Sequence, residues 1–194
     1  MDYLTVGLRG LVGVVFLVSF ISKVRSRDAF RTFGAFLRDL RLLPTPLVRP
    51  VALGIAVAEC AVCGLLAAPF PAPAAAGFTI AVALLTVFTA GIALLLRRGV
   101  RAPCQCFGES AVPIGLRHVV RNVLLAVLAG VGLSTAFAAG PPQVGGAVVA
   151  TLAGLLLGGL TVSLDDLVEL FQPVNSSVPN RLRGVPAVRD ESSR

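Results

Sequence analysis

Residues 51–68 read VALGIAVAECAVCGLLAA, an apolar run in which Glu59 is the one charged residue. About 20 consecutive apolar residues are what an α-helix needs to cross the hydrocarbon core of a bilayer. Other segments have the same character, and the full set is 3–22, 51–68, 74–96, 122–139 and 144–164. The strand alternation that a membrane β-barrel needs is absent. The sequence therefore predicts an all-α, polytopic transmembrane helix bundle of four or five spans.

Composition supports a membrane protein. Of the 194 residues, 56% are hydrophobic and 14% are charged, which is far more apolar than a typical soluble domain. The 17 basic and 10 acidic residues give a net charge of +7. Because the basic residues lie between the apolar segments, membrane topology explains them, and we do not expect nucleic-acid binding. Asp2 and the lack of a small-residue cleavage site indicate that the first segment is a retained span and not a signal peptide.

Residues 23–43 predict a short amphipathic helix at the membrane interface after the first span. Apolar residues recur there at helical spacing with charged residues between them; they are Phe30, Phe33, Phe36, Leu37 and Leu40. The alternative is a cytoplasmic extension of the first span. The prolines at 44 and 46 are expected to interrupt any helix.

The distribution of Lys and Arg predicts the orientation. These residues gather in the first and third connections, whereas the connections near 69–73 and 140–143 hold none. Cytoplasmic loops carry the excess of positive charge. We therefore expect a multi-pass protein of the cell (plasma) membrane, with its N-terminus outside, its C-terminus in the cytoplasm and membrane lipid around it. The polar residues 173–194 predict a disordered cytoplasmic tail.

Two cysteine pairs carry the chemistry. Cys60 and Cys63 form C-x-x-C inside the second span, and Cys104 and Cys106 form C-x-C in the polar loop PCQCFGE at 103–109. Residues three apart share a helix face, so Cys60 and Cys63 are within reach of a disulfide. Exchange needs a thiolate, which apolar surroundings disfavour, and the adjacent Glu59 is a candidate proton acceptor. The alternative is that both thiols are small buried hydrophobic residues.

Three further residues are candidates for supporting roles. An ionisable group such as Glu59 is costly inside a membrane and has a partner or a function, and Lys23 at the end of the first span is its best candidate partner. A structural ion pair and a proton-transfer role are both open. His118, the one histidine, is either a proton carrier or an interfacial polar residue.

The C-x-C pair has a property of its own. A disulfide between Cys104 and Cys106 would be strained and therefore oxidising.

These motifs resemble a known family. Glu59-Cys60-Ala61-Val62-Cys63 followed by Cys104-Gln105-Cys106-Phe107-Gly108 resembles the MauE family of methylamine-utilisation membrane proteins. Ser22-Lys23 with Glu59 is also similar to the broader DoxX-like group. The resemblance covers about residues 1–165. It implies a MauE/DoxX-like transmembrane domain over 1–172, with 173–194 left as the tail.

The resemblance also implies a function. The family is associated with the methylamine metabolic process, through maturation of the disulfide-bearing methylamine dehydrogenase with a thioredoxin-like exported partner. This chain is expected to serve methylamine dehydrogenase or another disulfide-bearing exported protein. Together with the cysteine pairs, it predicts a membrane thiol–disulfide oxidoreductase with Cys60, Cys63, Cys104 and Cys106 as redox-active residues. By analogy with quinone-linked disulfide-forming proteins, a quinone is a candidate cofactor, although no quinone motif is visible.

Two other function classes stay open. Cysteine pairs bind soft metals such as mercury or copper, so a metal carrier is one alternative. One Met and one His argue against it, and no resident metal site is predicted. A non-catalytic assembly factor is the other alternative. It predicts that Cys→Ser changes at all four positions leave function intact.

Overall fold

The computed structural model describes residues 2–39, 44–97, 116–138 and 143–171. The described residues form an all-helical bundle, and the helices are α1 (Asp2–Val24), α2 (Arg27–Asp39), α3 (Thr45–Ala67), α4 (Pro71–Arg97), α5 (Leu116–Thr135) and α6 (Val144–Phe171). Of these, α1, α3, α4, α5 and α6 are long and apolar enough to cross a membrane, which gives five candidate spans. The predicted fold class is confirmed.

Several helices are longer than their apolar segments. α3 begins at Thr45, six residues before the predicted span, and α5 begins at Leu116, six residues before its predicted start. The prediction that the prolines interrupt the chain is correct at Pro44, which precedes α3, but wrong at Pro46. Pro46 lies in the first turn of the helix, where no backbone N–H is needed for an intrahelical hydrogen bond.

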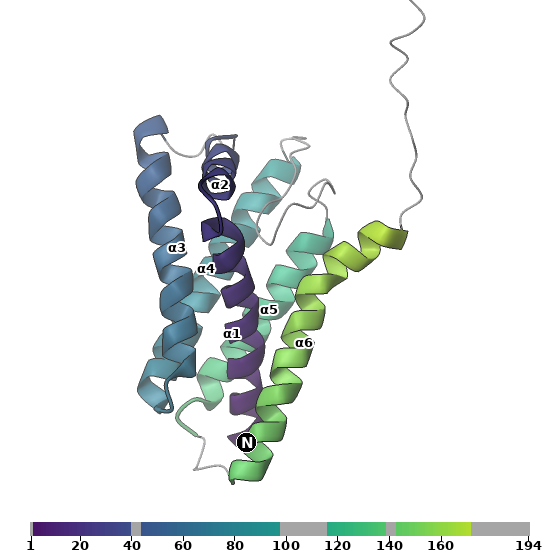
Figure 1. Ribbon diagram of the computed structural model, residues 1–194. Helices are drawn as coiled ribbons and strands as arrows, with labels where there is room; N and C mark the ends of the chain where they lie inside the picture. Colours follow the sequence, from purple (N-terminus) through teal and green to yellow (C-terminus); the bar gives the residue numbers. More distant parts are fainter. Residues whose placement is uncertain (1, 40–43, 98–115, 139–142, 172–194) are drawn as a thin grey trace, which may run out of the picture.

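The spans alternate in direction (Figure 1). The end of α1, the start of α3, the end of α4 and the start of α5 lie at the end of the bundle that carries α2, called here the α2 end. The N-terminus lies at the opposite end. The first and third connections, which hold most of the basic residues, therefore attach to the same end of the bundle. Which side of the membrane that end faces stays a prediction.

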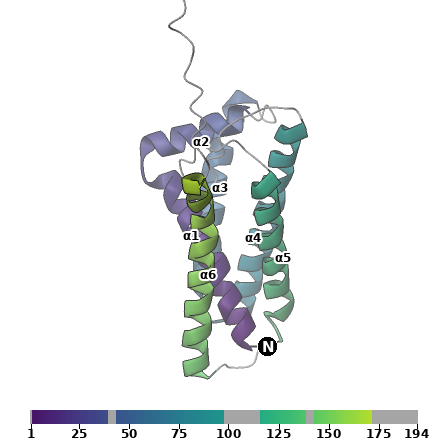
Figure 2. The same ribbon diagram turned by 90° about the vertical axis from the view of Figure 1, so that its right-hand side faces the viewer.

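The predicted amphipathic helix is confirmed as α2. It turns away from α1 and lies across one end of the bundle (Figure 2), so it is not an extension of the first span. Its apolar face is buried against α3 and α4 in a cluster of Phe33, Phe36, Leu37, Val48, Ala52, Ile92 and Leu95. Ser26 caps α2 by accepting a hydrogen bond from the N–H of Ala29 at 3.0 Å. Leu40 lies outside the described residues.

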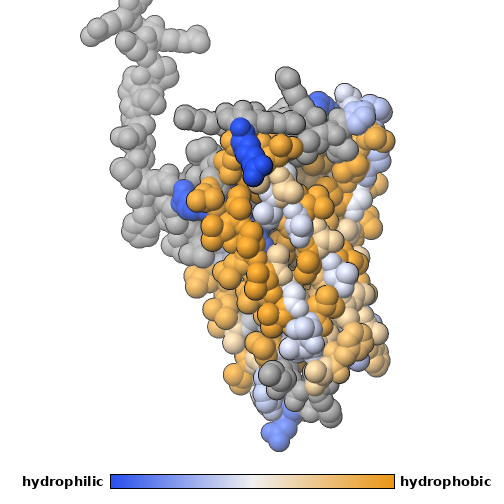
Figure 3. Space-filling view, turned by 180° about the vertical axis from the view of Figure 1, so that it is seen from behind, coloured by the Kyte–Doolittle hydropathy of each residue, from blue (hydrophilic) through white to orange (hydrophobic). Residues whose placement is uncertain are grey.

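α1 is the central helix and packs against α2, α3, α5 and α6. Its contact with α6 depends on small residues, as is common between membrane helices. A Cβ added at Gly154 would fall on the carbonyl oxygen of Gly7, so only glycine allows the two backbones to approach this closely. On the outside, large apolar side chains such as Val57, Val87 and Leu156 are exposed. Figure 3 shows this apolar belt on one face, with strongly hydrophilic residues toward its ends.

Candidate functional site

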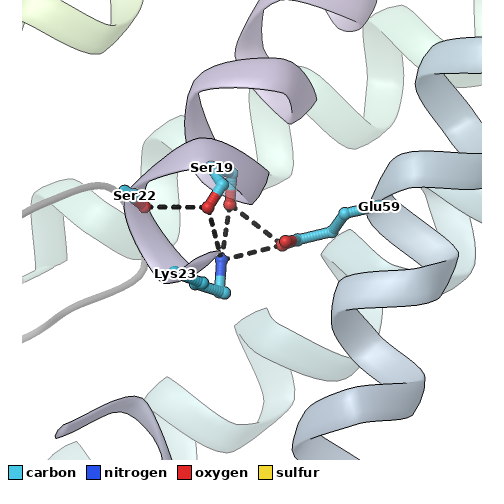
Figure 4. Close-up of polar contacts among 4 residues, drawn as sticks. All are labelled: Ser19, Ser22, Lys23 and Glu59. Atoms are coloured by element: carbon cyan, nitrogen blue, oxygen red, sulfur yellow. Dashed lines mark hydrogen bonds and ion pairs between the residues drawn. The ribbon is translucent and has the colours of Figure 1, made fainter. Parts of the chain in front are cut away.

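A buried ion pair joins α1 to α3 below α2. Lys23 Nζ lies 2.8 Å from Glu59 Oε1, and both side chains are 1% exposed. Ser19, one turn before Lys23 on α1, donates its hydroxyl to the same carboxylate oxygen at 2.9 Å (Figure 4). The predicted partnership of Lys23 with Glu59 is therefore present. Its role, structural or proton-transferring, stays a prediction.

The ammonium group of Lys23 is fully engaged. Besides Glu59, it donates to the hydroxyl of Ser19 at 2.6 Å and to the backbone carbonyl of Ser19 at 3.2 Å. Three acceptors match the three hydrogens of an ammonium group. The rings of Phe33 and Phe88 also face Nζ, with centroids at 5.1 and 5.9 Å. These contacts compensate the charge of Lys23 inside the bundle.

The carboxylate of Glu59 is only half engaged. Its Oε1 accepts from Lys23 and Ser19, whereas its Oε2 is buried and has no hydrogen-bond partner among the described residues. Buried polar atoms are almost always paired, so an unpaired carboxylate oxygen calls for an explanation. A carboxylate with one free oxygen can take up a proton there and later release it. This is the property that a proton acceptor for a neighbouring thiol needs.

Two polar residues of α5 lie at about the same depth as the ion pair. Thr5 donates a hydrogen bond to Thr135 at 2.9 Å, which fixes the register of α1 against the oppositely directed α5. Along α1, Lys23 lies roughly 26 Å from Thr5, and along α5, His118 lies about the same distance from Thr135, at about 1.5 Å per residue. Both residues are therefore at a similar depth in the bundle. His118 and Asn122, one turn further in, are 6% and 1% exposed. His118 is therefore buried near the start of α5, and its role, proton carrier or interfacial polar residue, stays a prediction.

The two thiols of α3 have different surroundings. Both are free, Cys60 being exposed and Cys63 only partly so. The thiol of Cys63 points to α1 and donates to the carbonyl oxygen of Gly13 at 3.8 Å. Cβ atoms three residues apart on a helix are about 5–6 Å apart, against 3.5–4.5 Å in a disulfide. Closing a disulfide here requires a local adjustment of α3, so such a bond would be strained and easily reduced.

Cys63 also faces a groove between α1, α3 and α6. The groove has a volume of about 370 Å³ and is lined mainly by small and apolar residues, with Arg9 and Thr151 as polar members. Arg9 closes the end of α3 by donating to the carbonyl oxygens of Ala68 at 3.1 Å and Phe70 at 3.3 Å. Arg9 thereby provides a donor for the carbonyl of Ala68, which caps α3, and connects α1 to the turn between α3 and α4.

The second predicted pair, Cys104 and Cys106, lies outside the described residues, and its approach to Cys60 and Cys63 stays a prediction. Sequence reasoning missed Ser19, Asn122 and Arg9. The spacing of Ser19 and Lys23, four residues apart on a helix, could have revealed the first, because such residues share a face. In the described part of the chain, no group of three or more His, Cys, Asp or Glu residues could hold a metal ion.

Comparison with known proteins gives a family. Residues 1–135 match the family model described as methylamine utilisation protein MauE. The methylamine utilization protein MauE of Paracoccus denitrificans is 36% identical over 160 residues, which cover 81% of this chain and 80% of that protein. No solved structure matches the chain. The matched region runs from α1 to the end of α5 and therefore includes the buried ion pair and the C-x-x-C. This multi-pass membrane protein belongs to the MauE family.

Proposed function

We propose that this protein takes part in methylamine utilisation, as the names of its family and of its Paracoccus relative suggest, and that it acts as a membrane thiol–disulfide oxidoreductase. The observation that carries the chemical proposal is the free Cys60–Cys63 pair beside Glu59, whose second carboxylate oxygen is buried without a partner among the described residues. Two thiols one helical turn apart, with a proton acceptor on the same helix, are the elements that disulfide exchange requires.

The relay has two exchange steps. A dithiol of a thioredoxin-like partner reduces a Cys104–Cys106 disulfide through a mixed disulfide, and two electrons and two protons pass to these cysteines. The resulting dithiol reduces a Cys60–Cys63 disulfide in the same way. Each step breaks one S–S bond and forms one. The Cys60–Cys63 dithiol then reduces a disulfide of an exported protein. With a quinone in place of the exported disulfide as final electron acceptor, the same two exchange steps would still oxidise the partner's dithiol to a disulfide, and the two electrons and two protons would pass to the quinone.

The position of the α3 pair supports a transfer across the membrane. The loop that carries Cys104 and Cys106 joins α4 and α5 at the α2 end. Cys63 lies only four residues before the opposite end of α3, a rise of about 6 Å, and 18 residues, or roughly 27 Å, from its start. The charge bias favours a cytoplasmic α2 end, so electrons would move from a cytoplasmic dithiol outward.

The surroundings of the thiols favour Cys60 as the receiving sulfur. The apolar cluster of α2, α3 and α4 fills the space between these helices, which favours an approach of the loop along the outside of α3. Cys60 is exposed on that outer surface, whereas Cys63 faces α1. Cys60 then forms the mixed disulfide, Cys63 resolves it, and Glu59 exchanges a proton with the departing thiol.

Variants with one cysteine in each pair test this order. The variant C63A/C104A keeps Cys60 with Cys106, and C60A/C104A is the matched control that keeps Cys63 instead. After mild oxidation in membranes, we expect an internal cross-link in the first variant and at least a ten-fold slower one in the second. Cross-linking is measured by mobility on non-reducing gels and by mass spectrometry. If none of the four possible pairings forms a cross-link, the relay is wrong.

Two further measurements separate the rival functions. In cells that grow on methylamine, the relay requires that changing any single cysteine to alanine slows growth and alters the redox state of the remaining three. An assembly factor without redox chemistry predicts normal growth of the variant that lacks all four. A soft-metal carrier predicts bound copper or mercury in the purified reduced protein at a stoichiometry that falls with each cysteine removed, and no exchange with a thioredoxin-like dithiol.

A further inference from the structure

A second groove lies between α2 and the first half of α3. Its volume is about 970 Å³, the larger of the two described here. Its floor is apolar and includes Phe30 from α2 and Val48 and Ala52 from α3. Its described lining includes neither Cys60 nor Cys63. The lining residues come from α2, from the start of α3 and from the link between α1 and α2, at the end of the bundle where α2 lies across the spans (Figure 2). We call it the α2–α3 groove.

The rim of the α2–α3 groove is strongly basic. Its described lining includes four arginines and no carboxylate; the arginines are Arg27, Arg31, Arg38 and Arg49. All four are exposed. The nearby Asp28 contacts Arg31 at 3.5 Å, but their side chains are 88% and 79% exposed, so this pair neutralises little charge. Ser26 and Thr45 add hydroxyl groups to the rim.

The apolar floor continues along α3 away from the arginines. Leu53, which lines the groove, is 58% exposed, and Val57, one turn further, is 61% exposed. Residues four apart lie on the same face of a helix. A ligand with an anionic group at the rim could therefore extend a hydrocarbon chain over Leu53 and Val57. A small soluble anion would use the arginines but would leave this apolar surface uncovered.

We propose that the α2–α3 groove is a binding site for an anionic phospholipid. The headgroup phosphate lies among the four arginines, whose planar guanidinium groups bind phosphate oxygens through paired N–H donors. One acyl chain follows the exposed face of α3. The position supports this, because an amphipathic helix across the end of apolar spans lies at the depth of lipid headgroups. Basic pockets at membrane helices recognise anionic lipid headgroups through these same interactions.

The absence of tryptophan from the chain allows a clean test. Single-tryptophan reporters are placed in the groove by F30W or, from the α3 side, by L53W. The F137W variant serves as control, because Phe137 is exposed beyond the end of α5, at the end of the bundle opposite α2. The intact protein is reconstituted into phosphatidylcholine vesicles that contain about one fifth phosphatidylglycerol, so that the membrane surface is anionic. Either lipid is brominated in turn, and quenching of the tryptophan fluorescence is measured.

We expect both groove reporters to prefer brominated phosphatidylglycerol by about five-fold or more, the effect of one or two arginines at a membrane surface. The F137W control should show a ratio close to one. The charge variant R38Q/R49Q should bring the groove ratio to near one. The matched variant R97Q/R117Q removes equal charge from the same end of the bundle but outside the groove, and should leave the ratio unchanged.

Three results would overturn the proposal. Equal quenching of both groove reporters by the two lipids would show that the groove does not select for charge. Equal loss of preference in both charge variants would show a general surface attraction instead of a site. Suppression of the preference by inorganic phosphate, but not by chloride at the same ionic strength, would identify a site for a soluble anion. The arginines that these variants replace are exposed, so the helices should be retained, and circular dichroism of each variant checks this.

Discussion

The buried Lys23–Glu59 pair offers the sharpest test of how this bundle is held together. We consider the substitution of Lys23 by methionine, which keeps a flexible side chain of similar length and removes the charge. In the structure, Nζ donates to Glu59 Oε1 at 2.8 Å and to the hydroxyl and carbonyl of Ser19 at 2.6 and 3.2 Å. The variant loses all of these hydrogen bonds and leaves Glu59 with Ser19 as its one remaining donor among the residues that the structure describes.

The expected cost follows from this geometry. Removing one partner of a buried ion pair leaves an uncompensated charge and costs about 3–5 kcal/mol. Both side chains here are 1% exposed, which places the pair in that class and not among surface pairs. Replacing both partners with apolar residues removes the charge altogether. The double variant K23M/E59L is therefore expected to lose much less than the sum of K23M and E59L, with a coupling of about 2 kcal/mol or more.

The assay is equilibrium unfolding of the purified protein in mixed micelles, followed by circular dichroism for the wild type, both single variants and the double variant. A matched control is D28N, which breaks the exposed contact between Asp28 and Arg31. An exposed pair contributes only about 0–1 kcal/mol, so D28N should be nearly neutral. The reasoning is refuted if the single variants at 23 and 59 cost no more than D28N, or if their effects simply add.

The remaining predictions concern packing, a helix end and the thiols. Gly154→Ala should destabilise the bundle by about 1–3 kcal/mol in thermal unfolding, because the new methyl group meets the backbone of α1. The control Gly159→Ala has open space around it and should change the stability by no more than about 0.5 kcal/mol. Arg9→Met should cost about 1–3 kcal/mol, because the carbonyl of Ala68 at the end of α3 loses its donor and the contact with Phe70 at the start of α4 is lost. Hydrogen exchange should rise first at the end of α3, and exchange that rises equally throughout α3 would contradict this. In single-cysteine variants, membrane-permeant N-ethylmaleimide should modify the exposed Cys60 at least ten-fold faster than the partly buried Cys63. Equal rates would contradict the difference in exposure between the two thiols.

Much of the fold could be read from local sequence. The spans appear as runs of apolar residues, because side chains that face lipid must be apolar and the backbone must form its hydrogen bonds within the helix. Such a run can be recognised without knowing which helices pack against it. Helix α2 was predictable because Phe33, Phe36 and Leu37 recur with helical period between charged residues. The boundaries were less accurate, since hydropathy detects only the part of α3 and α5 in lipid and not their polar first turns.

The candidate site was predictable only in part. Glu59 stood out because a charged residue in an apolar run is conspicuous, and Lys23 was the basic residue at the matching depth. Arg9 was overlooked because its partners are backbone carbonyls at the end of a different helix, which leave no mark in the sequence. Asn122 was taken only as the start of a span, because nothing in the sequence of α5 shows which face is turned inward.

The sequence by itself determined a bundle of four or five membrane helices, the amphipathic helix between the first two spans, and a C-x-x-C beside an intramembrane glutamate. These features are local, since transfer to lipid and helical periodicity depend on one segment at a time. Only the tertiary structure decided that α1 lies at the centre, that Ser19 completes the ion pair, and that Cys60 faces outward while Cys63 faces α1. Those choices depend on the rotation and depth of each helix, which close packing through residues such as Gly154 sets for the bundle as a whole.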